Sequence, residues 1–378
     1  MVIVSCDVEM LLWCDLLFCK KSDQQTNHIS PTTTNNTTTT SQHLNPIHTT
    51  TTSFLEEKNM TDEQYMRRCL QLAGCGIMGA KPNPMVGAVI VSADGRIIGE
   101  GYHRRCGEAH AEVNAFASVR SEDEPLLSNA TIYVSLEPCS HYGKTPPCAD
   151  LIIKKGVKRC VVGCVDPFAK VHGRGIQKLR DAGIEVTVGV LDDECRELNR
   201  RFITFNEHRR PYITLKWAET ANHFIDNDGK ALAISTPFTK MLSHRLRAEA
   251  DAILVGRTTD EREHPQLNTR NWAGPSPRRI VIDSSQPAFE GLDFTKPVVP
   301  QILSWLYDER CQWLIVEGGA KTLQSFIDAG AWDEIRIETA PLTVASGTRA
   351  PQLPDNAQLH SQQIYDGNTI RVFRNGTK

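Results

Sequence analysis

Residues 137 to 148 read EPCSHYGKTPPC, which places two cysteines, a histidine, a lysine and two adjacent prolines within twelve positions. A second segment, residues 107 to 112, reads GEAHAE. His110 offers an imidazole, and Cys139 and Cys148 offer thiolates. Three such ligands leave one position of a tetrahedral zinc ion open for water, as in catalytic zinc sites. The two segments therefore predict a zinc site that activates water for attack.

Glu112 lies two residues beyond His110, which is about 200° of rotation along a helix. It cannot share the direction of His110, but it can lie across the bound water and carry a proton to a leaving amine. Zinc deaminases use this arrangement, with the glutamate as acid/base and not as a ligand. Two alternatives stay open: a buried histidine with two unrelated cysteines, and a closed structural zinc site completed by Cys106 or His141.

The spacing of the cysteines narrows the class of substrate. Deaminases of nucleosides, transfer RNA and polynucleotides place their cysteines as C-x-x-C, whereas eight residues separate Cys139 from Cys148. The insert SHYGKTPP is expected to form a loop across the site. Lys144 can donate to a phosphate, Gly143 allows a close backbone approach, and the two prolines stiffen the return to the second cysteine. The loop therefore predicts contact with a phosphorylated substrate.

Length and composition restrict the classes of protein. A chain of 378 residues predicts two domains, and a net charge of −3 gives no basic field to hold a nucleic-acid backbone. The sequence contains no run of about eighteen apolar residues, so no membrane span is expected. Twelve scattered cysteines and the lack of a credible signal peptide predict a cytoplasmic location. Residues 1–59, with their Thr/Asn tract, are expected to form a disordered low-complexity extension; a targeting role is the alternative.

Helical and strand patterns alternate from residue 60 onward. Residues 60–209 predict a helix capped by Thr61, a hairpin that turns at Asp94-Gly95, and then alternating helices and strands that end in a polar helix and a basic link. Pro211 marks the boundary between the two halves. Residues 210–378 again alternate strands with helices, so both halves are predicted to be α/β layer structures.

Several motifs resemble the family of bifunctional deaminase–reductases of riboflavin biosynthesis. In the first half they are KPNPMVGAVIV, GYHRRCGEAHAE and EPCSHYGKTPPC. In the second half they are RPYITLKWAETA, LRAEADAILVGRTT, HPQLNTR, RRIVIDS and VEGGAKTLQSFIDAG. The resemblance runs from about residue 60 to the C-terminus. It implies a cytidine-deaminase-like three-layer sandwich over residues 60–209 and a shortened dihydrofolate-reductase-like α/β domain over residues 210–378.

The resemblance implies two successive reactions. The first half would hydrolyse the ring amine of a diaminohydroxypyrimidine ribosylamine 5′-phosphate and release ammonia. The second half would reduce the ribosyl group to ribityl with NADPH. Zinc and NADPH are therefore the implied cofactors, and a small phosphorylated pyrimidine is the implied partner, with no nucleic acid and no membrane. A homo-oligomer is expected from the resemblance.

The resemblance also implies the functional residues. In the first half these are the zinc ligands His110, Cys139 and Cys148, the acid/base Glu112, and the substrate contacts Asn83, His103, Lys144 and Thr145. In the second half the substrate positions are Lys216, Arg247, Leu267, Arg270 and Glu317, and the cofactor positions are Ala218, Thr259, Glu263, Ser284 and Gly319. Gly318-Gly319 opens a helix whose free amides can cradle a cofactor phosphate.

The sequence departs from the family pattern in both halves. Asp166-Pro167-Phe168-Ala169 stands where the family has Asp-Pro-Asn-Pro, so one polar substrate contact is missing. Glu263-His264-Pro265, Leu267-Asn268-Thr269-Arg270 and Asn222-His223-Phe224 also differ from the family. The connection from RRIVIDS to VEGG is shortened by roughly one strand. Either this strand is peripheral or the second half is impaired, because a lost central strand would expose backbone groups.

Three alternative functions remain. In the first, the chain is a deaminase whose second half is only structural, which failure to bind NADPH would support. In the second, it is a nucleic-acid-editing deaminase, which the acidic balance and the long cysteine spacing oppose. In the third, it is a non-catalytic scaffold stabilised by zinc, which predicts that chelation unfolds the chain and that no pyrimidine is turned over.

Overall fold

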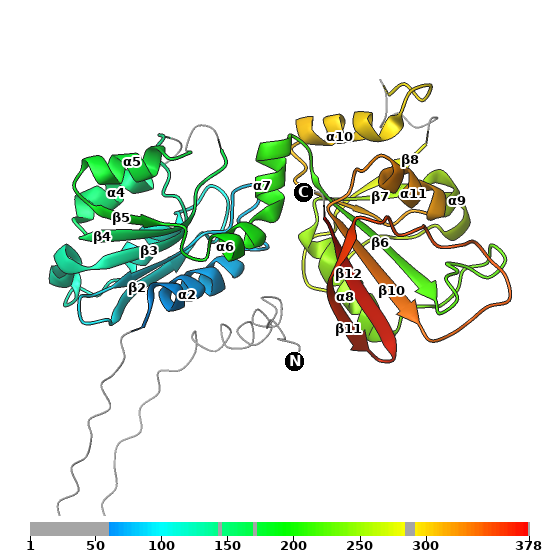
Figure 1. The fold of residues 1–378 in the computed structure, drawn as a ribbon, viewed down its shortest axis with the longest axis horizontal. Helices are drawn as coiled ribbons and strands as arrows, with labels where there is room; N and C mark the ends of the chain where they lie inside the picture. Colours follow the sequence, from blue (N-terminus) through cyan, green and yellow to red (C-terminus); the bar gives the residue numbers. More distant parts are fainter. Residues whose placement is uncertain (1–59, 143–145, 169–171, 284–291, 377–378) are drawn as a thin grey trace, which may run out of the picture.

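The computed structural model describes residues 60–142, 146–168, 172–283 and 292–376 (Figure 1). The predicted extension over residues 1–59 lies outside the described residues, as do Lys144, Thr145 and Ser284. The described chain forms two sheets, each covered by helices, and helix α7 (Arg200–His208) lies between them. Among the described helices, none has the length and apolar character that a membrane span requires.

The first sheet has five strands in the order β2-β1-β3-β4-β5. Strand β1 pairs antiparallel with β2 and β3, whereas β3, β4 and β5 are parallel to one another. The turn between β1 and β2 contains Gly95 at a φ of 87°, a conformation that glycine adopts without strain, so the predicted hairpin is confirmed. The strands are β1 (Gly87–Val91), β2 (Ile97–Tyr102), β3 (Thr131–Leu136), β4 (Arg159–Cys164) and β5 (Glu185–Val188).

Helices cover both faces of this sheet and complete a three-layer sandwich, as predicted. One apolar layer joins buried residues of α2 and α6 to Val89, Tyr133 and Val161 of the strands. The opposite layer joins buried residues of α3, α4 and α5 to Ala88 and Ile132, the neighbours of those strand residues. The alternation is that of a sheet buried on both faces. The helices are α2 (Asp62–Gly74), η1 (Glu124–Asn129), α3 (Ala111–Ala117), α4 (Cys148–Lys155), α5 (Arg174–Asp181) and α6 (Asp192–Leu198).

The segment that joins the two sheets differs from the prediction. The sequence predicted one polar helix and a basic link, but the structure has two helices, α6 and α7, that meet at Asn199. The Asn199 side chain is buried; it accepts a hydrogen bond from the Met85 amide (2.9 Å) and donates one to the Met85 carbonyl oxygen (2.9 Å). Its amide group therefore serves a distant segment, and the helix breaks at this residue.

The second sheet has seven strands in the order β11-β12-β10-β6-β9-β7-β8. The strands from β10 to β8 are parallel, and β12 pairs antiparallel with both β10 and β11. One face packs against α10 and α11, and Leu246 of α8 packs against the opposite face. The strands are β6 (Tyr212–Thr220), β7 (Ala252–Gly256), β8 (Arg278–Ile282), β9 (Trp313–Val316), β10 (Glu334–Ala340), β11 (Ala357–Tyr365) and β12 (Asn368–Asn375). The helices are α8 (Pro237–Glu249), α9 (Arg257–Glu263), α10 (Val298–Asp308) and α11 (Ala320–Asp328).

The shortened connection follows the outer strand β8. In the described residues the parallel strands β10, β6, β9, β7 and β8 pair without interruption, and the chain returns from β8 through α10 to β9. A strand missing from this connection would therefore lie next to the edge of the sheet and not within it. This placement favours the interpretation that the missing strand is peripheral.

Candidate active sites

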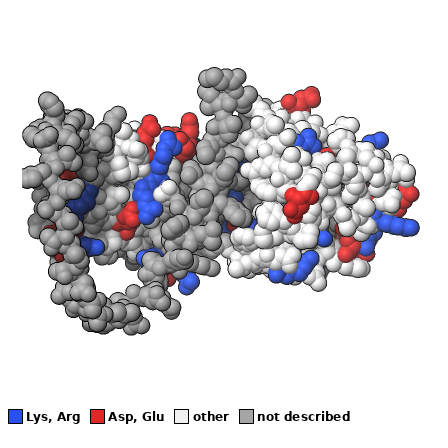
Figure 2. Space-filling view, turned by 90° about the horizontal axis from the view of Figure 1, so that it is seen from below, with Lys and Arg blue, Asp and Glu red and all other residues white. Residues whose placement is uncertain are grey.

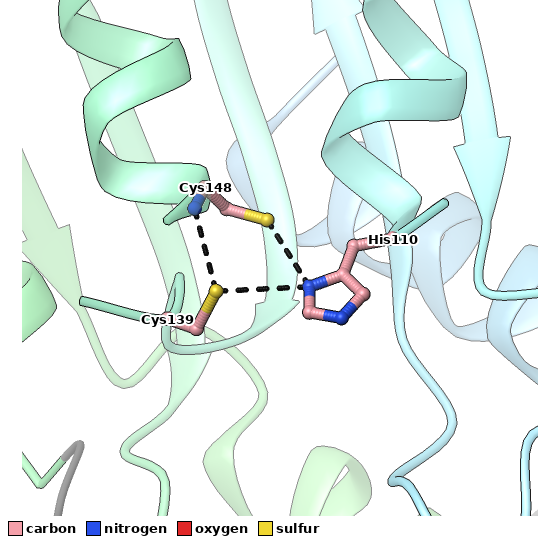
Figure 3. Close-up of side chains that lie close together, drawn as sticks. All are labelled: His110, Cys139 and Cys148. Atoms are coloured by element: carbon pink, nitrogen blue, oxygen red, sulfur yellow. Dashed lines mark hydrogen bonds between the residues drawn. The ribbon is translucent and has the colours of Figure 1, made fainter. Parts of the chain in front are cut away.

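The three predicted zinc ligands come together at one end of the first sheet (Figure 3). His110 is the residue before α3, Cys139 follows β3, and Cys148 begins α4. The His110 Nδ1 atom lies 3.3 Å from the Cys148 Sγ atom and 3.6 Å from the Cys139 Sγ atom. Their three ligand atoms lie within 4.8 Å of one another. One imidazole nitrogen and two sulfurs form a donor set that suits tetrahedral zinc with one open position.

The start of α4 prepares Cys139 to be a thiolate. Its Sγ accepts a hydrogen bond from the Cys148 amide (3.3 Å), and its carbonyl oxygen accepts one from the Ala149 amide (3.1 Å). The pKa of Cys139 falls to about 4, mainly because the Cys148 thiol donates a hydrogen bond to it and also because His110 lies beside it. An anionic sulfur at the start of a helix is further stabilised by the helix dipole.

The cluster is not completed by either residue proposed for a closed structural site. Within the described ranges, the group of possible metal ligands at this position contains only His110, Cys139 and Cys148. Cys106 is exposed, and the ring of His141 lies beside that of Phe168, with 6.3 Å between their centroids. The arrangement is therefore that of an open site.

Glu112 lies in the first turn of α3 and is only 3% exposed. It lines a cavity of about 70 Å³ together with His110, Cys139, Asn83 and His103. Burial raises the pKa of Glu112 above its ordinary value. A carboxylate whose pKa moves toward neutrality accepts and returns protons more effectively near pH 7.

Asn83 and His103, the two predicted pyrimidine contacts, are joined in the same cavity. The Nδ1 atom of His103 lies 3.1 Å from the carbonyl oxygen of Ala109, which can only accept, so Nδ1 is the donor. The Nε2 atom is then free to accept from the Asn83 side-chain amide at 3.1 Å. Burial lowers the pKa of His103, which favours this neutral form. The other two predicted contacts of the loop, Lys144 and Thr145, lie outside the described residues.

Sequence reasoning assigned no role to Glu137, although it stands in the quoted motif. It is buried, it lines the same cavity, and its carboxylate accepts hydrogen bonds from the amides of Gly173 (2.8 Å) and Gly175 (2.9 Å) at the start of α5. It thereby fixes the backbone that leads into Cys139. The signal in the sequence was an acidic residue at the end of an apolar strand. Phe168, which replaces a polar family residue nearby, is partly exposed.

A second cluster of charged residues lies in the C-terminal half. Arg247 of α8 forms a bidentate ion pair with Glu317, which follows β9, through Nε–Oε1 (3.1 Å) and Nη2–Oε2 (2.7 Å) contacts. Both side chains are largely buried. Burial raises the pKa of Glu317, but the charges of Lys216 and Arg247 outweigh it and hold the pKa below its ordinary value. Three of the predicted substrate residues therefore lie close enough to interact.

Two further residues qualify the prediction for this cluster. Leu267 is buried in the apolar layer with Val255 and Trp313, so its side chain is not available to a substrate. Arg270 is exposed and donates to the Asn268 side chain (2.9 Å). His244 was missed, although it lies one helical turn before Arg247; burial and the nearby arginines lower its pKa.

Two of the predicted cofactor residues, Thr259 after β7 and Gly319 after β9, are in direct contact. The Thr259 hydroxyl accepts a hydrogen bond from the Gly319 amide (2.8 Å), and Gly319 precedes α11. This amide already has a partner, so a phosphate that used it would displace Thr259. Ala218 lies on β6, and Glu263 is the exposed last residue of α9. Ser284 lies outside the described residues.

The comparisons with known proteins support the predicted class of each half. Residues 59–164 match the family described as the cytidine and deoxycytidylate deaminase zinc-binding region, and residues 211–369 match the RibD C-terminal domain. The RibD protein of Aquifex aeolicus is 37% identical over an alignment that covers 76% of this chain and 88% of the relative. The RibD protein of Bacillus amyloliquefaciens is 36% identical, with coverages of 77% and 87%. A solved deaminase/reductase from Thermotoga maritima, at 33% identity, covers 83% of this chain and 98% of its own with a TM-score of 0.74.

The fold and the site thus define a zinc-dependent deaminase joined to a reductase domain. The chain belongs to the RibD family of riboflavin biosynthesis proteins. It carries both enzymatic domains, a deaminase that uses zinc and a reductase that uses NADPH, as the resemblance implied. The findings therefore support the bifunctional interpretation over a deaminase with a purely structural second half.

Proposed function

We propose that the N-terminal half hydrolyses the ring amine of a diaminohydroxypyrimidine ribosylamine 5′-phosphate. The observation that carries the proposal is the group of three ligand atoms within 4.8 Å beside the buried Glu112. When bound there by His110, Cys139 and Cys148, zinc supplies the activation of a water molecule. His110 and Cys139 line a cavity, and among the described residues the group of possible ligands has no fourth member.

In this proposal, Glu112 moves the protons of the reaction. Its carboxylate takes a proton from the attacking water and gives one to the amine that leaves as ammonia. Asn83 and His103 orient the pyrimidine, since they lie in the same cavity and their mutual hydrogen bond fixes both side chains. Lys144 and Thr145 remain proposed contacts to the substrate. The balance is one water consumed and one ammonia released.

We further propose that the C-terminal half reduces the ribosyl group of the deaminated product. NADPH would supply a hydride to the sugar carbon, and a proton would be added as the ring opens to the ribityl chain. Lys216, Arg247 and Glu317 support a substrate site because they form one charged cluster. Arg270, exposed beside them, suits the phosphate. The main chain at Leu267 is the remaining proposed substrate contact, and Ala218, Thr259, Glu263, Ser284 and Gly319 are the proposed cofactor contacts.

Two separate assays test these reactions. Ammonia release from the diamino substrate tests the first half. NADPH oxidation with substrate already deaminated by another enzyme tests the second half in isolation. Ammonia release without NADPH oxidation would leave a deaminase alone, and absence of both would reject the bifunctional function for this chain.

The remaining predictions are also proposals. We place the domain boundary between residues 209 and 210, at the end of α7, and infer a cytoplasmic homo-oligomer that binds no nucleic acid. The nine described cysteines are all free, which suits a reducing compartment. On the described surface in Figure 2, basic and acidic side chains are interspersed, without a single-sign field. Leu359 and Ile364 are exposed on the outer strand β11, which supports burial by a second copy.

A further inference from the structure

Residues 81–86, KPNPMV, form the pyrimidine loop, which presents Asn83 to the cavity of the deaminase site. The loop precedes β1 and lies between the two sheets. Its far end is held at Met85, whose amide and carbonyl both bond to the Asn199 side chain. Asn199 belongs to the junction of α6 and α7, so the element that links the halves fixes one end of the loop.

The near end of the loop is held by the C-terminal half. The Lys81 Nζ atom donates to the carbonyl oxygen of Glu249 (2.6 Å) and to the Oδ1 atom of Asp251 (2.9 Å). The next residue, Pro82, accepts a hydrogen bond through its carbonyl oxygen from the Gln312 side chain (2.8 Å). These three contacts cross between residues that lie about 170 to 230 positions apart.

The carboxylate of Asp251, which accepts from Lys81, is held in place by contacts within the C-terminal half. The other oxygen of Asp251, Oδ2, accepts from the backbone amides of Gln312 (2.9 Å) and Trp313 (3.0 Å). The carboxylate is thus anchored to the starts of β7 and β9, and only about a quarter of its side chain is exposed. A charge-assisted contact to a fixed, partly shielded acceptor restrains the loop more than a flexible surface ion pair would.

We propose that Lys81 is a positioning residue for deamination: through Lys81, the reductase half holds the pyrimidine loop so that Asn83 meets the substrate. The proposal rests on the proposed role of Asn83. The deaminase site is then incomplete without the C-terminal half, which contributes no residue to the zinc cluster but sets one wall of the cavity. This gives the joining of the two domains a direct consequence for the first reaction.

The kinetic test uses full-length Lys81→Met and Lys81→Arg. Lys81→Met removes the charge and both hydrogen bonds but keeps an unbranched side chain only one atom shorter. Because Asn83 contributes binding and not proton transfer, we expect the KM for the diamino substrate to rise about tenfold with kcat within about twofold. Lys81→Arg, which can still donate to both acceptors, should return KM to within about threefold of the parent. Zinc content and NADPH oxidation on deaminated substrate should not change.

The matched control is Lys178→Met, which also breaks a lysine–aspartate pair of similar exposure, with Asp150, but within the first half alone. It should leave KM unchanged. Three results would overturn the proposal. A tenfold rise of KM in both variants would show that the loss of any such ion pair has this effect, and an unchanged KM in Lys81→Met would show that Lys81 has no role. A loss of zinc and kcat in Lys81→Met would show that Lys81 acts through the stability of the fold.

Amide hydrogen exchange provides a readout that does not depend on activity. In Lys81→Met the amides of Asn83 and Met85, which are hydrogen-bonded to Ala80 and Asn199, should exchange faster, and in Lys178→Met they should not. Unchanged exchange in Lys81→Met would show that the contact does not restrain the loop. If the parent protein released no ammonia, the proposed function would fail, while hydrogen exchange would still decide whether Lys81 restrains the pyrimidine loop.

Discussion

Replacing Glu112 by glutamine separates proton transfer from zinc binding. Glutamine fills the same buried space beside His110 and Cys139, so the three ligand atoms and the packing of α3 are retained. Its amide cannot carry a proton between water and amine. Acid–base catalysis contributes about 10²–10⁴-fold, and because one carboxylate serves both transfers we expect the upper end, a fall in kcat of about 10⁴-fold. This corresponds to about 5 kcal/mol in the barrier.

The assay is ammonia release by the full-length chain, with zinc per chain measured on the same sample. Glu108→Gln is the control, because Glu108 is an exposed carboxylate in the same segment. It should change the rate by no more than about twofold, as a surface substitution does. If Glu112→Gln retained more than about a tenth of the activity, Glu112 would not be the acid/base. If it lost zinc, the glutamate would be part of the metal site and the assignment would be wrong.

Three further perturbations address the two halves separately. Arg247→Met leaves the buried Glu317 carboxylate without its bidentate partner; we expect it to destabilise the C-terminal half by about 3–5 kcal/mol in a denaturant titration and to impair NADPH oxidation. The pKa of Glu317 is lowered in the folded chain, so its stabilising contribution is complete above its ordinary value of about 4.5 and is lost as the pH falls through the folded pKa; Glu317→Gln should flatten this part of the curve of unfolding free energy against pH. Removal of zinc by a chelator should abolish ammonia release and leave NADPH oxidation intact, since Lys216 lies on the other sheet; loss of both activities would contradict this separation.

Local patterns predicted the parts of the fold that depend on local chemistry. Thr61 and Gln64 form the capping box expected at the start of α2, and the turn at Asp94-Gly95 closes the expected hairpin. The zinc cluster was also predictable, because the residue types and their spacing on a strand end and two helix starts restrict where the side chains can meet. Both halves follow the predicted alternation of helix and strand.

Contacts between distant segments could not be predicted in this way. Asn199, where α6 gives way to α7, bonds through its side chain to Met85, and the contact of Lys81 with Asp251 joins one half to the other. No periodicity carries such information. Leu267 shows a related limit, since a family match gives a position but does not say whether the side chain or the backbone faces the site. His244 was missed because a single histidine on a helix is ordinary until its neighbours are known.

The shortened connection after β8 has a specific consequence for the reductase. Lys216 comes from the inner strand β6 and Glu317 follows the inner strand β9, so the substrate cluster does not depend on the edge of the sheet. Ser284, a proposed cofactor contact, comes two positions after Ile282, the last residue of the outer strand β8. We therefore expect Ser284→Ala to raise the KM for NADPH with kcat retained, and Lys216→Met to lower kcat. Steady-state NADPH oxidation with deaminated substrate distinguishes the two effects. If the parent chain failed to bind NADPH in a direct titration, the shortened connection would disturb more than the edge of the sheet. The placement of the missing strand at the periphery would then be wrong.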